Sequence, residues 1–316
     1  MLKISGFQPL PDCLVSKRQH SIIVGFPESM DTPITVLITG CSSGIGRELL
    51  NLFDREPYRV VATVLPGSAD SLKSGLERQS ERIWVRQLDV IDYDKASRIV
   101  RETAGRWGAI DILINNAGIS YRSVVEDMTV EDEQRQLQVN YLGAMHLIRE
   151  CLPAMREQRS GRIINISSVG GMMAMPTMAS YSASKFALEG ASESLWYELK
   201  PWGIHTSLVR PGFINSLAFL KVQYSRRREA QLGDSPYDAH YENMTRFVTK
   251  LMQKSPCTSE SVARSIFKIA RMKTPPLRVP GTTDARIFYW VRRLLPRALY
   301  HKLLYRFLPG IRNWGK

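Results

Sequence analysis

The sequence of 316 residues has few of the features that mark secreted, membrane-spanning or metal-binding proteins. It contains four cysteines, far apart and with no CxxC pair, which argues against a disulfide framework or a zinc site and fits a reducing compartment. No run approaches the ~18 apolar residues of a membrane-spanning helix, and nothing indicates a signal peptide. Internal repeats and low-complexity tracts are missing as well. These absences leave an ordinary globular protein, for which no metal site is expected.

What the sequence does contain is basic charge concentrated in one place. Lysine and arginine number 43 against 30 acidic residues, a net charge of +13. Nine of the basic residues lie in 278–316 together with a single acid, Asp284, so this tail alone carries +8. The rest of the chain is close to neutral, and we therefore expect no nucleic-acid partner. The meaning of the charge has to be sought in the tail.

Short apolar runs alternate with helical patterns along most of the chain. The expected strands are 35–39, 60–64, 83–88, 112–114, 162–166, 205–209 and 277–279, and the expected helices begin near residue 45 and cover 93–107, 131–157 and 183–199. Continuous apolar strands separated by helices are typical of a parallel sheet that is buried on both faces. The sequence therefore predicts an α/β fold, a doubly wound, Rossmann-like parallel sheet in a single domain.

The segments around this pattern are expected to be extensions of the domain. Residues 1–33 hold four prolines and little periodicity, which predicts an irregular N-terminal extension. The dinucleotide-binding domain is expected at 34–281, with the polar segment 215–260 inserted over the carboxyl edge of the sheet, where such folds bind ligands. Residues 282–316 form the basic amphipathic tail. Because the domain begins after them, residues 1–29 are expected to be dispensable.

A glycine cluster separates the first strand from the first helix, where residues 39–46 read Thr-Gly-Cys-Ser-Ser-Gly-Ile-Gly. These glycines permit a tight turn, close approach of the backbone to a pyrophosphate, and close packing of helix on strand. The helix N-terminus adds N–H groups and positive dipole for the phosphates. A purely structural turn is the alternative, but the order of strand, turn and helix favours a dinucleotide site.

A second candidate site combines a tyrosine, a lysine and a serine. Tyr181 and Lys185 are four residues apart on a helical pattern, so they share one face. An adjacent ammonium is expected to lower the pKa of the phenol, which then exchanges a proton with a carbonyl or alcohol while hydride moves to or from a nicotinamide. A surface Tyr–Lys pair is the alternative. Ser168 ends a strand 13 residues earlier, and its hydroxyl can hold the substrate oxygen beside the phenol.

These motifs resemble the short-chain dehydrogenase/reductase family over residues 34–280. The resemblance is carried by TGxxxGxG, Asn115-Asn116-Ala117-Gly118, Ser168, Tyr181-xxx-Lys185 and Pro211-Gly212, and is most similar to the retinol and 17β-hydroxysteroid dehydrogenase branch. It implies that Ser168, Tyr181 and Lys185 are catalytic. It adds Asn140, which would hold a water linking Lys185 to solvent; a locally bonded mid-helix asparagine is the alternative.

The resemblance also implies a set of cofactor-binding residues. Asp89 is expected to bind the adenine amino group, with a helix N-cap as an alternative or additional role. Ile214 is expected to present its N–H to the nicotinamide amide, and Ser216 stands where the family usually has threonine. The full set is Gly40, Ser42, Ser43, Gly44, Ile45, Gly46, Asp89, Val90, Asn116, Ala117, Gly118, Tyr181, Lys185, Pro211, Gly212, Ile214 and Ser216.

The end of the second strand bears on the choice of cofactor. Enzymes that prefer NAD carry an acid there, which accepts from the ribose 2′-hydroxyl. Here residues 62–66 read Ala-Thr-Val-Leu-Pro, with no acid and no arginine. The missing acid removes repulsion against a 2′-phosphate, which favours NADP(H) and leaves NAD(H) open.

The substrate and the surroundings of the site are less clearly marked. Met172, Met173, Met175 and Met178 suit a lipophilic substrate because methionine makes adaptable apolar walls, although ordinary packing explains them equally well. The run of arginines at 226–228 is expected to be a solvated charge run, with contact to an anionic substrate group as the alternative.

The tail combines basic residues with an apolar stripe. On a helix over 297–308, one face gathers Leu299, Tyr300, Leu303, Leu304, Phe307 and Leu308. A basic amphipathic helix of this kind suits the surface of an anionic membrane, and peripheral contact is expected through 287–312. The same stripe packed against the body or a second subunit is the rival interpretation.

These observations favour an enzyme over a binding protein. The expected function is NAD(P)-dependent interconversion of a secondary or allylic alcohol and its carbonyl, on a retinoid, steroid or lipid-like substrate. A non-catalytic NADP-binding sensor or scaffold on the same fold is the alternative. By analogy with the family we expect a homodimer or homotetramer, located in the cytoplasm or peripherally on a membrane surface.

Overall fold

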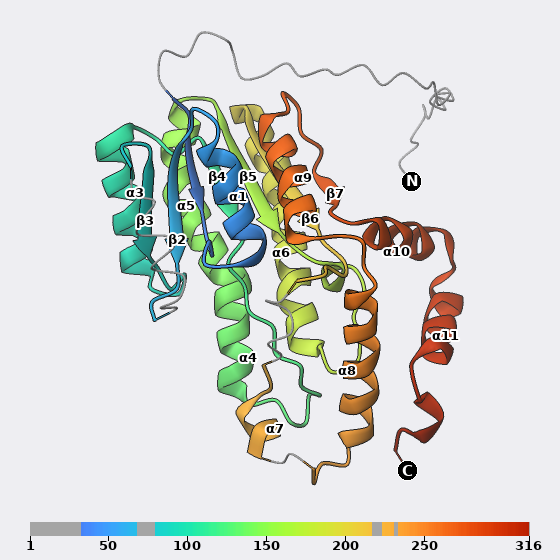
Figure 1. The fold of residues 1–316 in the computed structure, drawn as a ribbon. Helices are drawn as coiled ribbons and strands as arrows, with labels where there is room; N and C mark the ends of the chain where they lie inside the picture. Colours follow the sequence, from blue (N-terminus) through green and yellow to red (C-terminus); the bar gives the residue numbers. More distant parts are fainter. Residues whose placement is uncertain (1–32, 68–79, 217–222, 231–232, 316) are drawn as a thin grey trace, which may run out of the picture.

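The computed structural model describes residues 33–67, 80–216, 223–230 and 233–315. They form a seven-stranded sheet between two layers of helices (Figure 1). The strand order is β3-β2-β1-β4-β5-β6-β7, and every neighbouring pair is parallel. The chain reverses direction across the sheet between β1 and β4, so the fold is the doubly wound α/β fold that the sequence predicts.

Each predicted strand is found within one residue of its expected bounds. The strands are β1 (Thr35–Ile38), β2 (Arg59–Val64), β3 (Ile83–Gln87), β4 (Ile112–Asn115), β5 (Gly161–Ile166), β6 (Ile204–Arg210) and β7 (Arg278–Pro280). The helices are α1 (Gly44–Asp54), α3 (Tyr93–Trp107), α4 (Val130–Leu137), α5 (Gly143–Glu157), α6 (Ala179–Leu199), α7 (Arg226–Ala230), α8 (Asp238–Gln253), α9 (Ser259–Arg271), α10 (Thr283–Leu294) and α11 (Arg297–Phe307).

Alternate residues of the strands build two separate cores, one on each face of the sheet. Val36 and Ile38 of β1 belong to the core beneath α1 and α9, whereas Leu37 belongs to the core beneath α3, α5 and α6. Phe53 of α1 is fully buried, and its ring lies 4.8 Å from that of Phe267 in α9. Each such large apolar side chain contributes about 1.5–3 kcal/mol to folding.

The single long helix expected over 131–157 is interrupted. A π-helical turn, Gln138–Leu142, separates α4 from α5. Such single turns occur often at functional sites, and this one carries Asn140. Directly after it, Gly143 lets α5 begin close to the sheet edge, because a Cβ there would lie 2.8 Å from the carbonyl oxygen of Val90.

Beyond the carboxyl ends of the strands, α4, α7 and α8 extend below the sheet (Figure 1). The expectation of a solvated charge run at 226–228 is wrong for Arg228. This side chain is buried, lies 2.5 Å from Asp238 and stacks 4.0 Å from the ring centre of Tyr241. Arg226 pairs with Asp132 at 3.4 Å and lies 3.9 Å from Glu131. Arg226 and Arg228 therefore attach α7 to α4 and α8.

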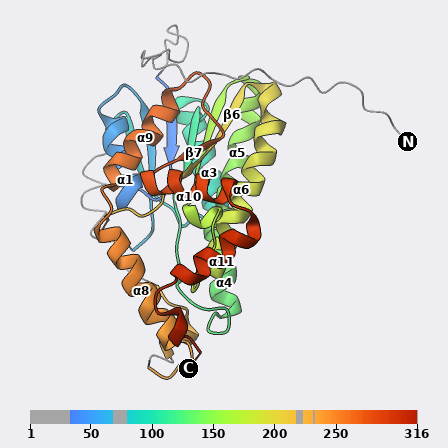
Figure 2. The same ribbon diagram turned by 90° about the vertical axis from the view of Figure 1, so that its right-hand side faces the viewer.

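The C-terminal helices α10 and α11 lie across the outside of the body (Figure 2). Of the stripe expected to face a membrane, Tyr300 is buried against Val169, Met172 and Met173. Leu299 and Phe307 of the same stripe are 45% and 76% exposed. Leu304 and Leu308 are partly buried against apolar clusters as well, so packing against the body explains part of the stripe and leaves Leu299 and Phe307 on the surface.

No helix among residues 33–67, 80–216, 223–230 and 233–315 is long and apolar enough to cross a membrane. The expectation that residues 1–29 are dispensable concerns a segment outside the described residues and stays a prediction.

Candidate active site

The glycine loop is built to keep its backbone open. Gly40 adopts φ +73°, a left-handed conformation that suits glycine, and a Cβ on Gly46 would lie 2.2 Å from the carbonyl oxygen of Gly40. The side chain of Asn116 donates to the carbonyl oxygens of Thr39 (2.9 Å) and Gly40 (3.1 Å). The loops after β1 and β4 are therefore tied together where the strand order reverses.

A groove of about 300 Å³ runs along this loop and contains most of the residues expected to bind the cofactor. The groove is lined by Gly40, Ser42, Ser43, Gly44, Ile45, Leu65, Leu88, Asp89, Val90, Asn116, Ala117, Gly118, Ile119, Arg135 and Val139. The N-terminus of α1 opens into it, which favours bound phosphate. Gly46 supports the loop from behind, because its missing Cβ makes room for the carbonyl oxygen of Gly40.

Asp89 lies on the edge of this groove, and its alternative role as a helix N-cap is wrong. Asp92 caps α3 instead, accepting from the backbone N–H of Lys95 at 3.0 Å. Asp89 accepts from the N–H of Ile91 and pairs with Arg135 of α4 at 3.0 Å. Arg135 is therefore a groove residue that the sequence did not reveal, because nothing in α4 indicates its distant partner.

Ser168 and Tyr181 meet in a cavity of about 30 Å³. Its walls are Ser168, Val169, Gly170, Met173, Met175, Met178, Tyr181, Ser182, Gly212, Phe213 and Val248. Gly170 makes room for the phenol, since a Cβ there would lie 2.9 Å from a ring carbon of Tyr181. The neighbouring Ser167 is not among the walls, and its hydroxyl lies against Gly171.

Burial controls the protonation of the Tyr–Lys pair. Although Tyr181 as a whole residue is only partly buried, desolvation raises the pKa of its hydroxyl, and a hydrogen bond with Ser168 opposes that rise. Burial lowers the pKa of Lys185 to about 8, and the charge of Glu189 opposes that change. The expected lowering of the Tyr181 pKa by Lys185 is therefore wrong for the chain itself. The ammonium donates to the carbonyl oxygen of Ile166 at 2.8 Å and lies 5.9 Å from the phenol ring centre.

Asn140 connects the π-helical turn to this centre. Its side chain accepts from the N–H of Ile119 at 2.8 Å, and donates to the Ile119 carbonyl at 2.9 Å and to Ser184 Oγ at 3.0 Å. These partners lie outside its own helix, so the locally bonded alternative is wrong. A Cβ on Gly118 would be 3.2 Å from Asn140 Oδ1 and 3.7 Å from Lys185 Nζ. Both polar groups therefore approach the same point of the β4 loop.

The loop 211–216 closes the site from the other side and is held by the tail. The N–H of Gly212 donates to Thr282 Oγ1, and that of Phe213 donates to Asp284 Oδ2, each at 2.8 Å. Ile214 within this loop is buried, and Ser216 is the last described residue of the loop. Thr282 and Asp284 were not predicted as site residues. The sequence signals only a helix N-cap at Thr282, not a partner 70 residues away.

Comparison with known proteins agrees with this geometry. A family profile described as short chain dehydrogenase matches residues 34–226. The chain is 32% identical to retinol dehydrogenase 8 of Bos taurus, over 90% of this chain and 94% of that protein. It is 32% identical to 3-ketodihydrosphingosine reductase of Bacteroides thetaiotaomicron, over 78% and 87% of the two chains. The solved structure of ElxO with NADP bound matches with a TM-score of 0.63 and 26% identity, covering 79% of this chain and 98% of that one.

Proposed function

Since this chain belongs to the short chain dehydrogenase family, we propose that it interconverts a secondary or allylic alcohol and its carbonyl in a lipophilic molecule. The family and its relatives make it an NAD(P)-dependent oxidoreductase. The observation that carries the proposal is the apolar cavity in which Ser168 and Tyr181 meet. A phenol and a hydroxyl directed at one small space suit a single reacting oxygen, held by one group and protonated or deprotonated by the other.

The roles of the four polar groups follow from their positions. A bound nicotinamide supplies or accepts the hydride at the reacting carbon. Its raised pKa keeps Tyr181 protonated at neutral pH, so the phenol is ready to give its proton to a carbonyl oxygen in reduction. In oxidation, Tyr181 must first lose this proton, and the phenolate then takes the proton of the alcohol. Ser168 orients the oxygen. Lys185 brings positive charge beside the phenol, and Asn140 positions the loop that Lys185 faces.

Methionine, phenylalanine and valine side chains make the walls lipophilic. A volume of about 30 Å³ is roughly the share of one water molecule, so Met175, Met178 and Val248 must shift to admit a substrate. Methionine adapts readily in this way. One relative is named for retinol and another for 3-ketodihydrosphingosine, and a substrate of that kind would fill such walls. The decisive test is NAD(P)H oxidation with retinal, steroid ketones and long-chain ketones. Activity restricted to small polar carbonyls would contradict the proposal.

The groove supports NADP(H) as the preferred cofactor. Leu65, which follows β2, lines the groove and is 47% exposed, in the place where a carboxylate would repel a 2′-phosphate. We expect NADPH to bind more tightly than NADH, and Leu65→Asp to reverse or erase that preference. Fluorescence titration of both cofactors against both proteins measures this. Tighter binding of NADH by the unmodified protein would refute it.

We also propose peripheral membrane contact through 287–312. Large apolar side chains are exposed along both C-terminal helices, namely Ile287, Trp290, Leu294, Leu299 and Phe307, beside exposed basic residues such as Lys302 and Arg306. This combination suits the headgroup boundary of anionic lipid. Ile287→Ser with Leu294→Ser and Phe307→Ser should abolish flotation with anionic vesicles, whereas the equally exposed control Val125→Ser should float like the parent.

Removal of the whole tail is a poorer test, because a chain ending at Gly281 also loses Thr282 and Asp284, which hold the 211–216 loop. If the parent does not float at low salt, the membrane proposal falls. The expected homodimer or homotetramer is a separate proposal, supported by exposed Phe186 and Tyr197 on α6 (41% and 63%), and sedimentation would measure it.

A further inference from the structure

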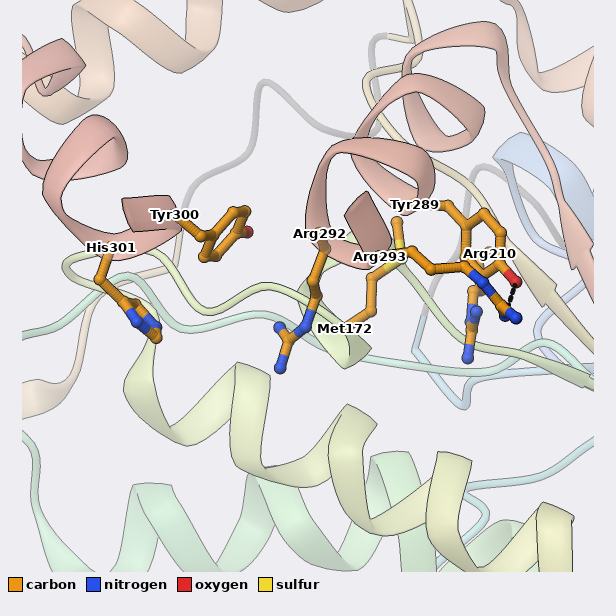
Figure 3. Close-up of a pocket in the computed structure, with 7 residues that line it drawn as sticks. All are labelled: Met172, Arg210, Tyr289, Arg292, Arg293, Tyr300 and His301. Carbon is orange, nitrogen blue, oxygen red and sulfur yellow. Dashed lines mark hydrogen bonds between the residues drawn. The ribbon is translucent and has the colours of Figure 1, made fainter. Parts of the chain in front are cut away.

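A second cavity, of about 560 Å³, lies between the C-terminal helices and the body (Figure 3). It is lined by Met172, Arg210, Tyr289, Arg292, Arg293, Tyr300 and His301. Three arginines and a histidine thus share one space with two tyrosines, and the described lining residues include no carboxylate. An arrangement of this kind selects for negative charge.

One of the three arginines is already neutralised. Arg210 is buried and donates through Nε to Glu189 at 2.7 Å, with a second contact to the same carboxylate. Arg278 approaches Glu189 as well, at 3.6 Å, and pairs with Glu193 at 2.6 Å. Of these four residues only Arg210 lines the cavity, and its charge is already paired.

The other two arginines have no acidic partner in the described part of the chain. Arg293 donates to the hydroxyl of Tyr289 at 2.9 Å, and Arg292 lies 5.9 Å from the ring centre of Tyr300. No described carboxylate lies within 4.0 Å of either guanidinium. Both guanidinium groups therefore keep the forked donor geometry that binds phosphate or carboxylate.

Tyr300 supplies an independent observation that points to a polar ligand in this cavity. The residue is 4% exposed, and its hydroxyl has no hydrogen-bond partner among the described residues. Figure 3 shows its ring pointing from α11 toward Arg292. A buried hydroxyl without a partner is unfavourable, and an oxyanion bound beside Arg292 would satisfy it once the atoms that cover the hydroxyl shift.

The cavity is a close neighbour of the catalytic centre. Met172 lines it, while the next residue, Met173, lines the catalytic cavity. Val169, a wall of the catalytic cavity, belongs to the same apolar cluster as Tyr300. Ser168 and Met172 are four residues apart in sequence, so their Cα atoms are at most about 14 Å apart. One extended molecule is long enough to occupy both spaces.

We propose that this cavity binds the phosphate or carboxylate group of an amphiphilic substrate whose reacting carbonyl or hydroxyl lies at Ser168 and Tyr181. The proposal rests on the proposed oxidoreductase function and narrows its substrate from lipophilic to anionic and amphiphilic. Arg292 and Tyr300 hold the anionic group, and Arg293 adds positive charge at the other end of the cavity, beside Tyr289. The apolar part follows Met172 and Met173 toward the catalytic cavity.

The test is calorimetric titration, at low salt and below micelle formation, with dodecyl phosphate, dodecanol and inorganic phosphate. The parent protein should bind dodecyl phosphate at least tenfold more tightly than either of the other two. The double variant Arg292→Ala/Arg293→Ala should lose at least tenfold in affinity for dodecyl phosphate, as expected for charge-assisted hydrogen bonds. Tyr300→Phe should lose about threefold. Arg306→Ala, an exposed cation on α11 outside the cavity, should stay within twofold of the parent.

Three outcomes would overturn the proposal. Equal affinity for dodecanol would show that the site recognises only the alkyl chain of the ligand. Equal affinity for inorganic phosphate would show that the site binds free anions. A double variant that loses flotation with phosphatidic acid vesicles but keeps its affinity for dodecyl phosphate would show surface docking to lipid. Turnover separates this proposal from the general one. Turnover of a neutral ketone by the parent protein tests the oxidoreductase function by itself, and selective anion binding without any turnover would refute the oxidoreductase proposal alone.

Discussion

The two sides of the candidate site are held in different ways. The inner side, made of the glycine loop, the β4 loop, Ser168 and the start of α6, is fixed by short hydrogen bonds among elements of the sheet core. The outer side, the loop 211–216, is held by Thr282 and Asp284 of the tail and by apolar side chains of α8. Chemistry is thus placed on rigid elements, while the cover of the site depends on a segment far away in sequence.

This difference gives the tail a second role beside its surface properties. The start of α10 hydrogen-bonds the backbone of the loop expected to face the nicotinamide, and α11 covers the segment 169–173 next to Ser168. Anything that binds the tail therefore acts close to the site. Substitutions in the inner side and in the outer side can be compared, to test whether the two sides support the site independently of each other.

The largest effect should come from the inner side. Tyr181→Phe removes only the proton donor, so kcat should fall at least 10²-fold while NADPH affinity stays close to that of the parent. Steady-state kinetics and cofactor titration measure the two quantities. If the variant kept more than about a tenth of kcat, proton transfer by Tyr181 would not be part of the mechanism.

A glycine in the outer side tests how firmly the tail holds the loop. In Gly212→Ala, the new Cβ would lie 2.0 Å from Asp284 Oδ2, so the loop and α10 must separate. We expect a melting temperature lower by several degrees, from a cost of about 1–3 kcal/mol for overpacking, and a raised KM for the cofactor. Gly190→Ala on α6, where a Cβ meets nothing within 4 Å, is the matched control and should be neutral or slightly stabilising. A Gly212→Ala protein indistinguishable from its control would show that the loop does not need the tail.

The inner side can be predicted from the sequence to a larger extent than the outer side. Strands are found within a residue, because a buried parallel strand must be a continuous apolar run. The glycine loop and the Tyr–Lys spacing are local, so motifs identify them. The π-helical turn at Gln138–Leu142 is not predicted, because residues 131–142 contain no glycine or proline that would indicate an interruption of the helix. Asp89 and Asp92 both follow β3 and both fit an N-cap, and only the structure assigns the cap to Asp92.

The outer side depends on contacts that have no local signal. Nothing in the sequence around Asp284 shows that it accepts from Phe213, or that Arg228 is buried against Asp238. The apolar stripe of α11 is equally suited to a lipid surface and to a protein surface, because both require the same periodicity. Its division between buried Tyr300 and exposed Phe307 follows only from where α11 lies.

A smaller effect is expected from pH, and it again concerns the inner side. Burial lowers the pKa of Lys185 to about 8 from 10.5. Between these values the unfolded chain binds more protons than the folded one, so this group makes the free energy of unfolding rise with pH in that window. Below pH 8 Lys185 is protonated in both the folded and the unfolded state, so the destabilisation that comes from burying its ammonium is fully present. Relative to Lys185→Met, the parent should gain about 2 kcal/mol between pH 7.5 and pH 10. Urea unfolding at both values measures this, and parallel pH curves for the two proteins would contradict it.

The smallest effect should come from outside both sides. The first described strand takes its partners from the body. The N–H of Thr35 donates to Asp111 at 2.8 Å, the carbonyl oxygen of Ile34 accepts from Arg59 at 2.9 Å, and β1 pairs with β2 and β4. The described neighbours of β1 thus provide its hydrogen-bond partners and cover its side chains, so residues 1–29 are not needed for either purpose. Deletion of these residues should leave the melting temperature and kcat/KM within experimental error of the parent. The Gly212→Ala variant, measured in the same experiment, should show a lower melting temperature and serves as the comparison. A fall as large as that of the Gly212→Ala variant would show that residues 1–29 pack on the domain, and the site would then have a third supporting segment besides the sheet core and the tail.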